Sequence, residues 1–239
     1  VNDVHCGDTI AFMRELPDAC AHLIIADPPY NIDKDFGVGT FFRDQTEWID
    51  WSRSWLSESK RLLHEAGNLF VYAIHHNACY LQCLLYEMGL VYRRQMIWYY
   101  ENGWSKYRKG PACHYEPILW FAKRASSTYL TIREPYKSTE RLKHRIIKNG
   151  KVWTPNPSGR HAGDVWHIPT LAGRRFARER EDHPTQKPLA LSLRLVRHFS
   201  NPGELVLVPF VGSGSECVAA IQLGRRFTGA EINPSYMAI

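Results

Sequence analysis

Cysteine is scarce in this sequence, and the cysteines present are not spaced for metal binding. The 239 residues contain 6 cysteines, none of which belongs to a C-x-x-C pair. Structural zinc sites and iron–sulfur clusters are usually built on such pairs, so we expect no metal site. Disulfides persist mainly in oxidising compartments. Because the spacing indicates no pairing of the cysteines, we expect buried free thiols and a reducing, cytoplasmic location.

Long apolar runs are also absent. No run approaches the ~18 residues that cross a bilayer, and the chain does not open with a charged and then apolar signal-peptide pattern. We expect no association with a membrane. A length of 239 residues suits one sizeable α/β domain with an insertion better than two equal domains.

Acidic residues are sparse in one segment. Residues 124–180 hold 13 of the 30 Lys and Arg residues but only 4 of the 24 Asp and Glu residues, a net charge of +9, whereas the rest of the chain has a net charge of −3. Such a basic insert on a faintly acidic scaffold is typical of a protein that binds a polyanion such as a nucleic acid. A solvated basic surface is the alternative, but it does not explain the confinement of the charge.

Strand-like and helix-like runs alternate along the chain, which favours a doubly wound α/β fold. We predict strands at residues 1–6, 23–26, 68–74, 91–100, 116–122, 206–208 and 226–230, and helices at residues 9–16, 46–64, 77–88, 189–199 and 216–223. The strand at 116–122 is expected to be antiparallel and at or near an edge. Residues 31–45 are expected to form a mobile loop, and the tryptophans of 46–64 to pack in the core.

The tetrapeptide Asp27-Pro28-Pro29-Tyr30 directly follows the apolar run at 23–26. Proline has no N–H and a fixed φ, so this backbone offers carbonyl acceptors with few competing donors. The carboxylate adds an acceptor, and the tyrosine adds a ring for stacking. This combination suits a flat heterocycle that presents an amino group, as a base swung out of a nucleic-acid stack does. A plain proline-rich turn is the alternative.

A second motif lies near the other end of the chain. The apolar run 206–208 leads through Pro209-Phe210-Val211 into Gly212-Ser213-Gly214-Ser215 and then a predicted helix. A strand, a Gly-x-Gly turn and a helix open a nucleotide-binding unit, although the third glycine of G-x-G-x-x-G is missing. The next strand ends in Glu231, which is spaced to bind ribose hydroxyls.

A third motif, His183-Pro184-Thr185-Gln186-Lys187-Pro188, precedes the helix predicted at 189–199. It is a rigid loop that carries a hydroxyl, an amide and a cation. By itself it also fits a polar helix cap.

In this order, the three motifs resemble those of the S-adenosylmethionine-dependent amino-methyltransferases of DNA. The resemblance is to the beta class, in which the catalytic motif D-P-P-Y comes first, a target-recognition region follows, and H-P-T-Q-K-P and D-P-F-x-G-S-G-[ST] come last. It spans residues 8–236. The sequence departs from the pattern at Val208, where the family has an Asp that helps to hold the cofactor. The resemblance therefore leaves cofactor affinity open, without implying inactivity.

The resemblance implies a Rossmann-like methyltransferase fold with a circularly permuted motif order. Its sheet is expected to have seven strands, mostly parallel, with one antiparallel strand, and to carry the basic insertion. Residues 1–122 form the catalytic half of the domain, 123–182 the target-recognition insertion and 183–239 the cofactor-binding half. The last two strands are expected beside the first ones, so that the catalytic and cofactor loops share one crevice. Gly163-Asp164-Val165-Trp166 is expected to be a structural re-entry into the sheet.

The resemblance also implies roles for individual residues. Asp27, Pro28, Pro29 and Tyr30 are expected to hold the target base. Residues expected to bind S-adenosylmethionine are Asp8, His183, Thr185, Lys187, Phe210, Gly212, Ser213, Gly214, Ser215 and Glu231. Asp8 is also placed to cap a helix. Residues expected to contact DNA phosphates are Arg141, Lys143, Arg145, Lys148, Lys151, Arg174 and Arg175.

The implied activity is methylation of adenine N6 in double-stranded DNA by a bacterial or phage-encoded, nucleoid-associated enzyme, as in restriction–modification. A homodimer is possible by analogy with relatives. Cytosine-N4 methylation uses the same amino chemistry, although relatives of that kind more often begin the tetrapeptide with Ser. Cytosine-C5 chemistry needs a nucleophilic cysteine usually preceded by proline, and the sequence has no Pro-Cys dipeptide. A non-catalytic DNA-binding relative weakened at Val208 is a further alternative.

Overall fold

The computed structural model describes residues 2–31, 42, 44–102 and 110–238. In this part of the chain the main sheet contains eight strands in the order β1-β12-β11-β2-β3-β5-β4-β10. Its strands are β1 (Asn2–Cys6), β2 (Ala21–Ala26), β3 (Leu63–Tyr72), β4 (Val91–Tyr99), β5 (Tyr115–Ala122), β10 (Val165–His167), β11 (Leu205–Val208) and β12 (Arg226–Glu231). Among these strands β5 alone runs antiparallel to its neighbours β3 and β4.

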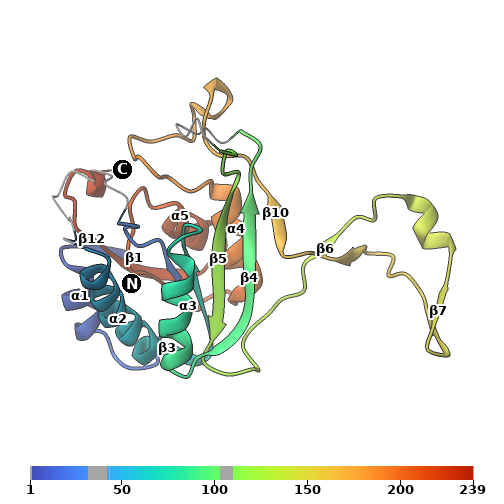
Figure 1. The fold of residues 1–239 in the computed structure, drawn as a ribbon, viewed down its shortest axis with the longest axis horizontal. Coiled ribbons are helices and arrows are strands. Elements are labelled where there is room, and N and C mark those ends of the chain that lie inside the picture. The colour runs from blue at the N-terminus through green and yellow to red at the C-terminus, as the bar shows by residue number, and fades with distance from the viewer. Residues whose placement is uncertain (1, 32–41, 43, 103–109, 239) are drawn as a thin grey trace.

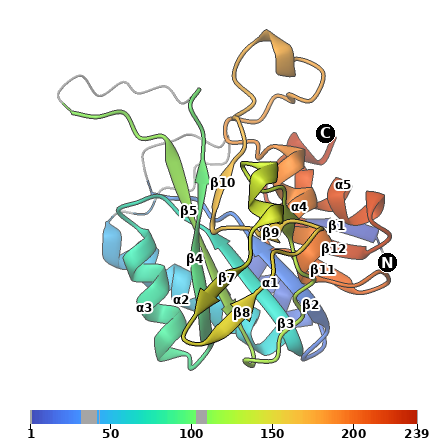
Figure 2. The ribbon, with the colours of Figure 1, turned by 90° about the vertical axis from the view of Figure 1, so that its right-hand side faces the viewer.

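Two helical layers enclose the sheet (Figures 1 and 2). The helices α1 (Thr9–Glu15), α2 (Gln45–Leu62) and α3 (Ala78–Glu87) pack on one face, whereas α4 (Leu189–Phe199) and α5 (Ser215–Gln222) pack on the other. In β2, Leu23 and Ile25 face α4 and α5, and Ile24 and Ala26 face the other layer. A parallel strand covered on both faces is apolar throughout, which explains the run at 23–26.

The sheet confirms the predicted permuted arrangement. β11 pairs in parallel with β2 on one side and with β12 on the other, so the last strands of the chain lie between β1 and β2. The carboxyl ends of β2 and β11 therefore meet at one edge. This pairing brings the segments after Ala26 and Val208 together.

Three details differ from the sequence prediction. The sheet has eight strands rather than seven, because β10 adds to the outer side of β4. β5 is antiparallel as predicted but is an interior strand, since β4 and β10 lie beyond it. The thiols of Cys6, Cys79, Cys83 and Cys113 are exposed rather than buried, although all six cysteines are free.

The extra strand comes from the predicted re-entry segment. Val165 to His167 pair with Ile97 to Tyr99, and the buried Trp166 packs into the core with Met96 and Trp98. The apolar Trp166 side chain thus anchors the end of the basic segment to the sheet. This segment is therefore joined to the main sheet, and the division of the chain into three regions stays a prediction.

Between β5 and β10 the chain forms an arm that projects from the body (Figure 1). β6 (Arg133–Glu134) pairs with β9 (Arg160–His161) at its base, and β7 (Ile146–Lys148) pairs with β8 (Lys151–Trp153) farther out, after the short helix η1 (Thr139–Lys143). The turn Asn149-Gly150 has φ values of 52° and 69°, as a tight hairpin turn requires. Glu134 forms ion pairs with Arg194 of α4 (2.6 Å) and with Arg160 (3.1 Å), which fixes the base of the arm.

Several predicted features lie in the helical layers. Trp48 and Trp55 are fully buried, as predicted, and Trp51 packs against Trp55 and Phe210. Most of the loop predicted at 31–45 lies outside the described residues. None of the described helices is long and apolar enough to cross a membrane.

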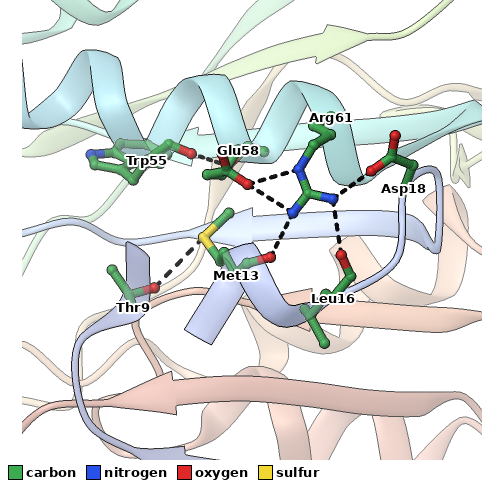
Figure 3. Close-up of polar contacts among 8 residues, drawn as sticks. Thr9, Met13, Leu16, Asp18, Trp55, Glu58 and Arg61 are labelled. Carbon is green, nitrogen blue, oxygen red and sulfur yellow. Dashed lines mark hydrogen bonds and ion pairs between the residues drawn. The ribbon is translucent and has the colours of Figure 1, made fainter. Parts of the chain in front are cut away.

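One arginine ties α1 to α2 (Figure 3). Arg61, in the last turn of α2, donates hydrogen bonds to the backbone oxygens of Met13 (2.7 Å) and Leu16 (2.9 Å) at the end of α1. It also forms ion pairs with Asp18 and Glu58. Carbonyl groups at a helix end have fewer intrahelical partners. The Met13 oxygen accepts from the Leu16 N–H as well, and the guanidinium adds donors to both oxygens and holds the two helices together.

We predict that Arg61→Met destabilises the protein by about 2–4 kcal/mol, because two charge-assisted hydrogen bonds to these carbonyls are lost. Urea unfolding followed by circular dichroism measures this. Arg53→Met is the matched control: its ion pair with Glu87 is exposed and contributes about 0–1 kcal/mol. Equal losses in the two variants would contradict the role given to Arg61.

Candidate active site

The tetrapeptide after β2 is held so that one of its carbonyl groups stays available. The indole of Trp48 donates to the Pro29 oxygen (2.8 Å), and the side-chain amide of Asn77 donates to the Tyr30 oxygen. Gln45 in turn donates to Asn77 (3.2 Å). Within the described residues, no donor reaches the Pro28 oxygen. The turn thus leaves the Asp27 carboxylate and the Pro28 carbonyl as acceptors beside each other.

The loop after β11 depends on glycine for its shape. Gly212 and Gly214 have φ values of 53° and 77°, which residues with a Cβ rarely adopt. A Cβ on Gly212 would lie 2.9 Å from Nε2 of His183, whereas one on Gly214 would meet open space. Gly212 therefore permits a close approach between this loop and the loop 183–188, and Gly214 serves as the N-cap of α5.

Glu231 ties the end of β12 to the glycine loop. Its carboxylate accepts hydrogen bonds from the backbone N–H of Gly212 (2.7 Å) and of Asn233 (2.8 Å). Ser215 joins the third motif to the same place, since its hydroxyl donates to the Lys187 backbone oxygen (2.8 Å). The glycine motif is therefore in direct contact with both Glu231 and the third motif.

A pocket opens where the motifs meet. Of the residues predicted to form the site, those that line it are Asp27, Pro28, Pro29, Tyr30, His183, Thr185, Lys187, Phe210, Gly212, Ser213 and Glu231. Gly214 and Ser215 are not among the lining residues: Gly214 caps α5, and Ser215 contacts the Lys187 backbone. The pairing of β2 with β11 thus brings eleven of the fourteen predicted catalytic and cofactor-binding residues to one cavity.

Asp8 lies at a second, adjoining pocket. This pocket is lined by Gly7, Asp8, Thr9, Pro29, Trp51, Pro209, Phe210, Ala230, Glu231 and Ile232, and it shares Pro29, Phe210, Glu231 and Ile232 with the first. Asp8 is also the N-cap of α1, with its carboxylate accepting from Ala11 N–H (2.8 Å). Both roles considered for Asp8 are thus compatible with its position.

A buried lysine lies at the centre of the catalytic motif. The Lys187 ammonium is 3.0 Å from the Asp27 carboxylate and 3.2 Å from that of Glu116, at the start of β5. It also contacts the Tyr30 hydroxyl (3.3 Å), which itself donates to Asp27. The sequence analysis assigned Lys187 to the cofactor, whereas its contacts in the structure are with the tetrapeptide. It still lines the shared pocket.

Charge compensation keeps this lysine protonated. Burial by itself lowers the pKa of Lys187, but Asp27 and Glu116 outweigh burial and raise it well above the ordinary value. Burial, together with the nearby carboxylates of Asp27 and Glu116, also raises the pKa of the Tyr30 phenol. The phenol therefore remains a hydrogen-bond donor that fixes one Asp27 oxygen, while Lys187 fixes the other.

Sequence analysis missed several residues of the site. Glu116 and Asn77 have no motif around them: one precedes an apolar strand, and the other precedes a helix. Glu216 and Tyr236 also line the pocket. Glu216 directly follows the glycine motif, so its proximity to the pocket could have been read from the sequence.

The basic residues fall into two groups (Figure 1). Arg141, Lys143, Arg145, Lys148 and Lys151 lie on the arm, from η1 to β8. Arg174 and Arg175 lie in the short helix η2 (Arg174–Phe176), on a separate loop that rises beyond the carboxyl ends of the strands. Within the arm, Lys143 pairs with Glu140 and Arg141 lies over the Tyr136 ring. The two groups therefore offer cations on two different projections.

We predict that Lys187→Met destabilises the protein by about 3–5 kcal/mol, since it leaves two buried carboxylates without their shared cation. Adding Glu116→Gln should recover part of this loss by removing one of the two charges. Urea unfolding of both variants measures the effect. A double variant no more stable than Lys187→Met would show that charge compensation is not the reason.

Comparison with known proteins places this arrangement in a family. Residues 21–239 match the family model of N6 and N4 methyltransferases, described as DNA methylase. The chain is 31% identical to the type II methyltransferase M1.MboII of Moraxella bovis, over 99% of this chain and 94% of that protein. It is 32% identical to the DNA adenine methyltransferase YhdJ of Escherichia coli K12, over 97% of this chain and 78% of that protein.

A solved structure shows the same fold. The crystal structure of the M1.HpyAVI–SAM complex superposes with a TM-score of 0.65 at 22% identity, covering 100% of this chain and 97% of that one. The family match covers most of the residues and includes all three motifs. The chain belongs to the DNA methylase family of N6 and N4 amino-methyltransferases.

Proposed function

We propose that this protein transfers a methyl group from S-adenosylmethionine to the N6 amino group of an adenine flipped out of double-stranded DNA. One observation carries the proposal: Asp27 and Pro28, whose carbonyl accepts from no donor of the described residues, line the same pocket as the Gly212 turn. Two acceptors for an amino group thus face a loop built for a nucleotide-like cofactor.

The pockets suit the parts of the cofactor. Glu231 belongs to both pockets, at the point where a ribose would join an adenine to a methionine end. The second pocket has the Trp51 and Phe210 rings and offers an apolar site for the adenine, with Asp8 at its rim. At Gly212 a Cβ would meet His183, so glycine is needed for this loop to lie against His183 in the wall of the pocket.

The tetrapeptide is arranged to activate an amino nitrogen. The lone pair of an exocyclic amine is delocalised into the ring, which makes it a poor nucleophile. When Asp27 and the Pro28 carbonyl accept hydrogen bonds from its two protons, the nitrogen is favoured in a more pyramidal form. S-adenosylmethionine, when bound, supplies a methyl group activated by a sulfonium. Holding the reactants in this geometry contributes several kcal/mol to catalysis, on the order of effective molarities in other systems.

Lys187 and Tyr30 determine the state of Asp27. Because both hold the carboxylate in place, it remains an oriented acceptor and does not need to be a strong base. The methylated nitrogen is acidic enough to pass its extra proton to an Asp27 oxygen and on to water. Tyr30 is expected to stack on the base, yet it is only 4% exposed. Its contact with the base is therefore confined to the small part of the residue that lines the pocket.

Two observations favour adenine over cytosine as the target base. Cytosine-N4 relatives more often have Ser where this chain has Asp27, and the chain is similar to the DNA adenine methyltransferase YhdJ.

The arm and the η2 loop would contact DNA phosphates on either side of the flipped base. We place the enzyme in the bacterial cytoplasm, since the relatives named above are bacterial. A homodimer remains part of the proposal by analogy only.

We predict that expression of the protein in a methylation-free bacterial host yields N6-methyladenine at one recurring DNA sequence. Single-molecule sequencing locates the modified positions, and mass spectrometry of nucleosides identifies the base. Asp27→Ala should abolish the modification while the purified variant still binds the cofactor. N4-methylcytosine in the host that expresses the wild-type protein would support cytosine-N4 methylation instead. Modified DNA in the host that expresses Asp27→Ala would overturn the role of Asp27.

We predict that Lys148→Ala/Lys151→Ala on the arm weakens binding to target and non-target DNA alike. If each lysine neutralises one phosphate, the slope of log K against log salt becomes shallower by about 2. Fluorescence anisotropy at several salt concentrations measures this. Lys60→Ala on α2, on the opposite helical layer, is the control, and an equal change in that variant would argue against contact between the arm and DNA.

A further inference from the structure

A buried carboxylate in the pocket has no role in the steps above. Glu216, in the first turn of α5, is 6% exposed and lines the pocket beside Gly212 and Ser213. The Ser192 hydroxyl of α4 donates to one of its oxygens (2.9 Å). In the described part of the chain this is the one side-chain hydrogen bond to the carboxylate, and the backbone of Glu216 itself supplies a further one. The carboxylate faces the pocket and can accept from a ligand there.

Among the described residues, no cation forms an ion pair with Glu216. The nearest cation in the site, Lys187, is already shared by Asp27 and Glu116. Burial raises the pKa of Glu216 to about 7, and the neighbouring Asp27 adds to this. A carboxyl group with this pKa is roughly half protonated near neutral pH, so its negative charge is only partly present in the free protein. A cationic ligand would restore its charge.

The family residue that would hold the cofactor is missing at the end of β11. Val208 is 1% exposed and packs in the apolar core, so it offers no polar atom to the pocket. Glu216 stands on the other side of the glycine turn, at the start of the helix that follows. The chain thus has a carboxylate within the same loop unit, but it is displaced from the strand end to the helix.

We propose that Glu216 binds the α-ammonium group of the methionine end of the cofactor, in place of the aspartate absent at position 208. This rests on the proposed function, since it assumes S-adenosylmethionine in this pocket. The ammonium would form the ion pair that Glu216 lacks in the free protein. The carboxylate of the same amino acid end would lie toward the hydroxyls of Thr185 and Ser213, which line the pocket as well.

Two ligands that differ only at the amino acid end test this. S-adenosylhomocysteine carries the ammonium, and 5′-methylthioadenosine has the same nucleoside and thioether without it. In calorimetric titrations, Glu216→Gln should bind S-adenosylhomocysteine about 10- to 100-fold more weakly, as expected for a lost charge-assisted contact. Its affinity for 5′-methylthioadenosine should equal that of the wild type, which also shows that the pocket is intact.

Glu231→Gln is the matched control, because it should weaken both ligands by similar factors through the shared ribose. Unchanged S-adenosylhomocysteine affinity in Glu216→Gln would overturn the inference, and so would an equal loss for both ligands. Failure of the wild type to bind either ligand would instead contradict the proposed function. The two proposals can therefore fail separately.

The pH dependence gives a second readout. In the wild type, S-adenosylhomocysteine affinity should rise between pH 6 and pH 8, roughly tenfold per unit below the raised pKa, because binding requires the ionised form of Glu216. Asp27, Lys187, Tyr72 and Cys217 surround Glu216, and His183 lines the same pocket. The wild type and Glu216→Gln share these groups. Any pH dependence of the affinity that is lost in Glu216→Gln is therefore caused by Glu216. Identical slopes in the two proteins would overturn the inference.

Discussion

The ammonium group of Lys187 joins three parts of the chain that are far apart in sequence. It contacts Asp27 after β2 and Glu116 at the start of β5, and it reaches them from the loop that precedes α4. A buried ion pair is weak evidence for stability, because desolvation offsets much of the attraction. Its importance here is geometric. The carboxylate of Asp27 can present one orientation to a substrate only while Tyr30 and Lys187 occupy its oxygens.

This arrangement also determines the electrostatics of the pocket. Asp27, Glu216 and Glu231 line it, and Lys187 is the one lysine or arginine among its described lining residues. Glu231 is satisfied by two backbone N–H groups, and Asp27 by Lys187, so their charges are largely compensated. The remaining negative character is centred on Glu216. A pocket of this kind favours a ligand with cationic groups, which agrees with a sulfonium cofactor that also carries an ammonium.

The sequence was sufficient where a property is encoded in consecutive residues. The apolar run at 23–26 predicted a strand, and the motifs predicted the loops that follow β2 and β11. Most site residues could be named because they belong to those motifs. The contacts of Lys187 could not be predicted, since they depend on Glu116, which is about 70 residues away and lies in no motif. The eighth strand was missed because β10 has only three residues, and Trp166 is stabilised there by packing in the core rather than by a local pattern.

The permuted order of the motifs along the chain has little effect on the chemistry, because a parallel sheet brings the two motif loops to the same edge in either order. In a parallel pair the carboxyl ends of both strands lie at the same edge, whichever strand comes first along the chain. β2 and β11 are separated by about 180 residues, yet Leu23 pairs with Val206 and Ile24 with Leu207. The site therefore requires only that these strands be neighbours. The order of the chain instead decides where an insertion can lie, and here it places the basic arm between β5 and β10. Glu134 at the base of the arm pairs with Arg194 of α4, and α4 follows directly after the loop that carries Lys187. The arm is thus anchored to the same helix whose preceding loop holds Asp27 in place.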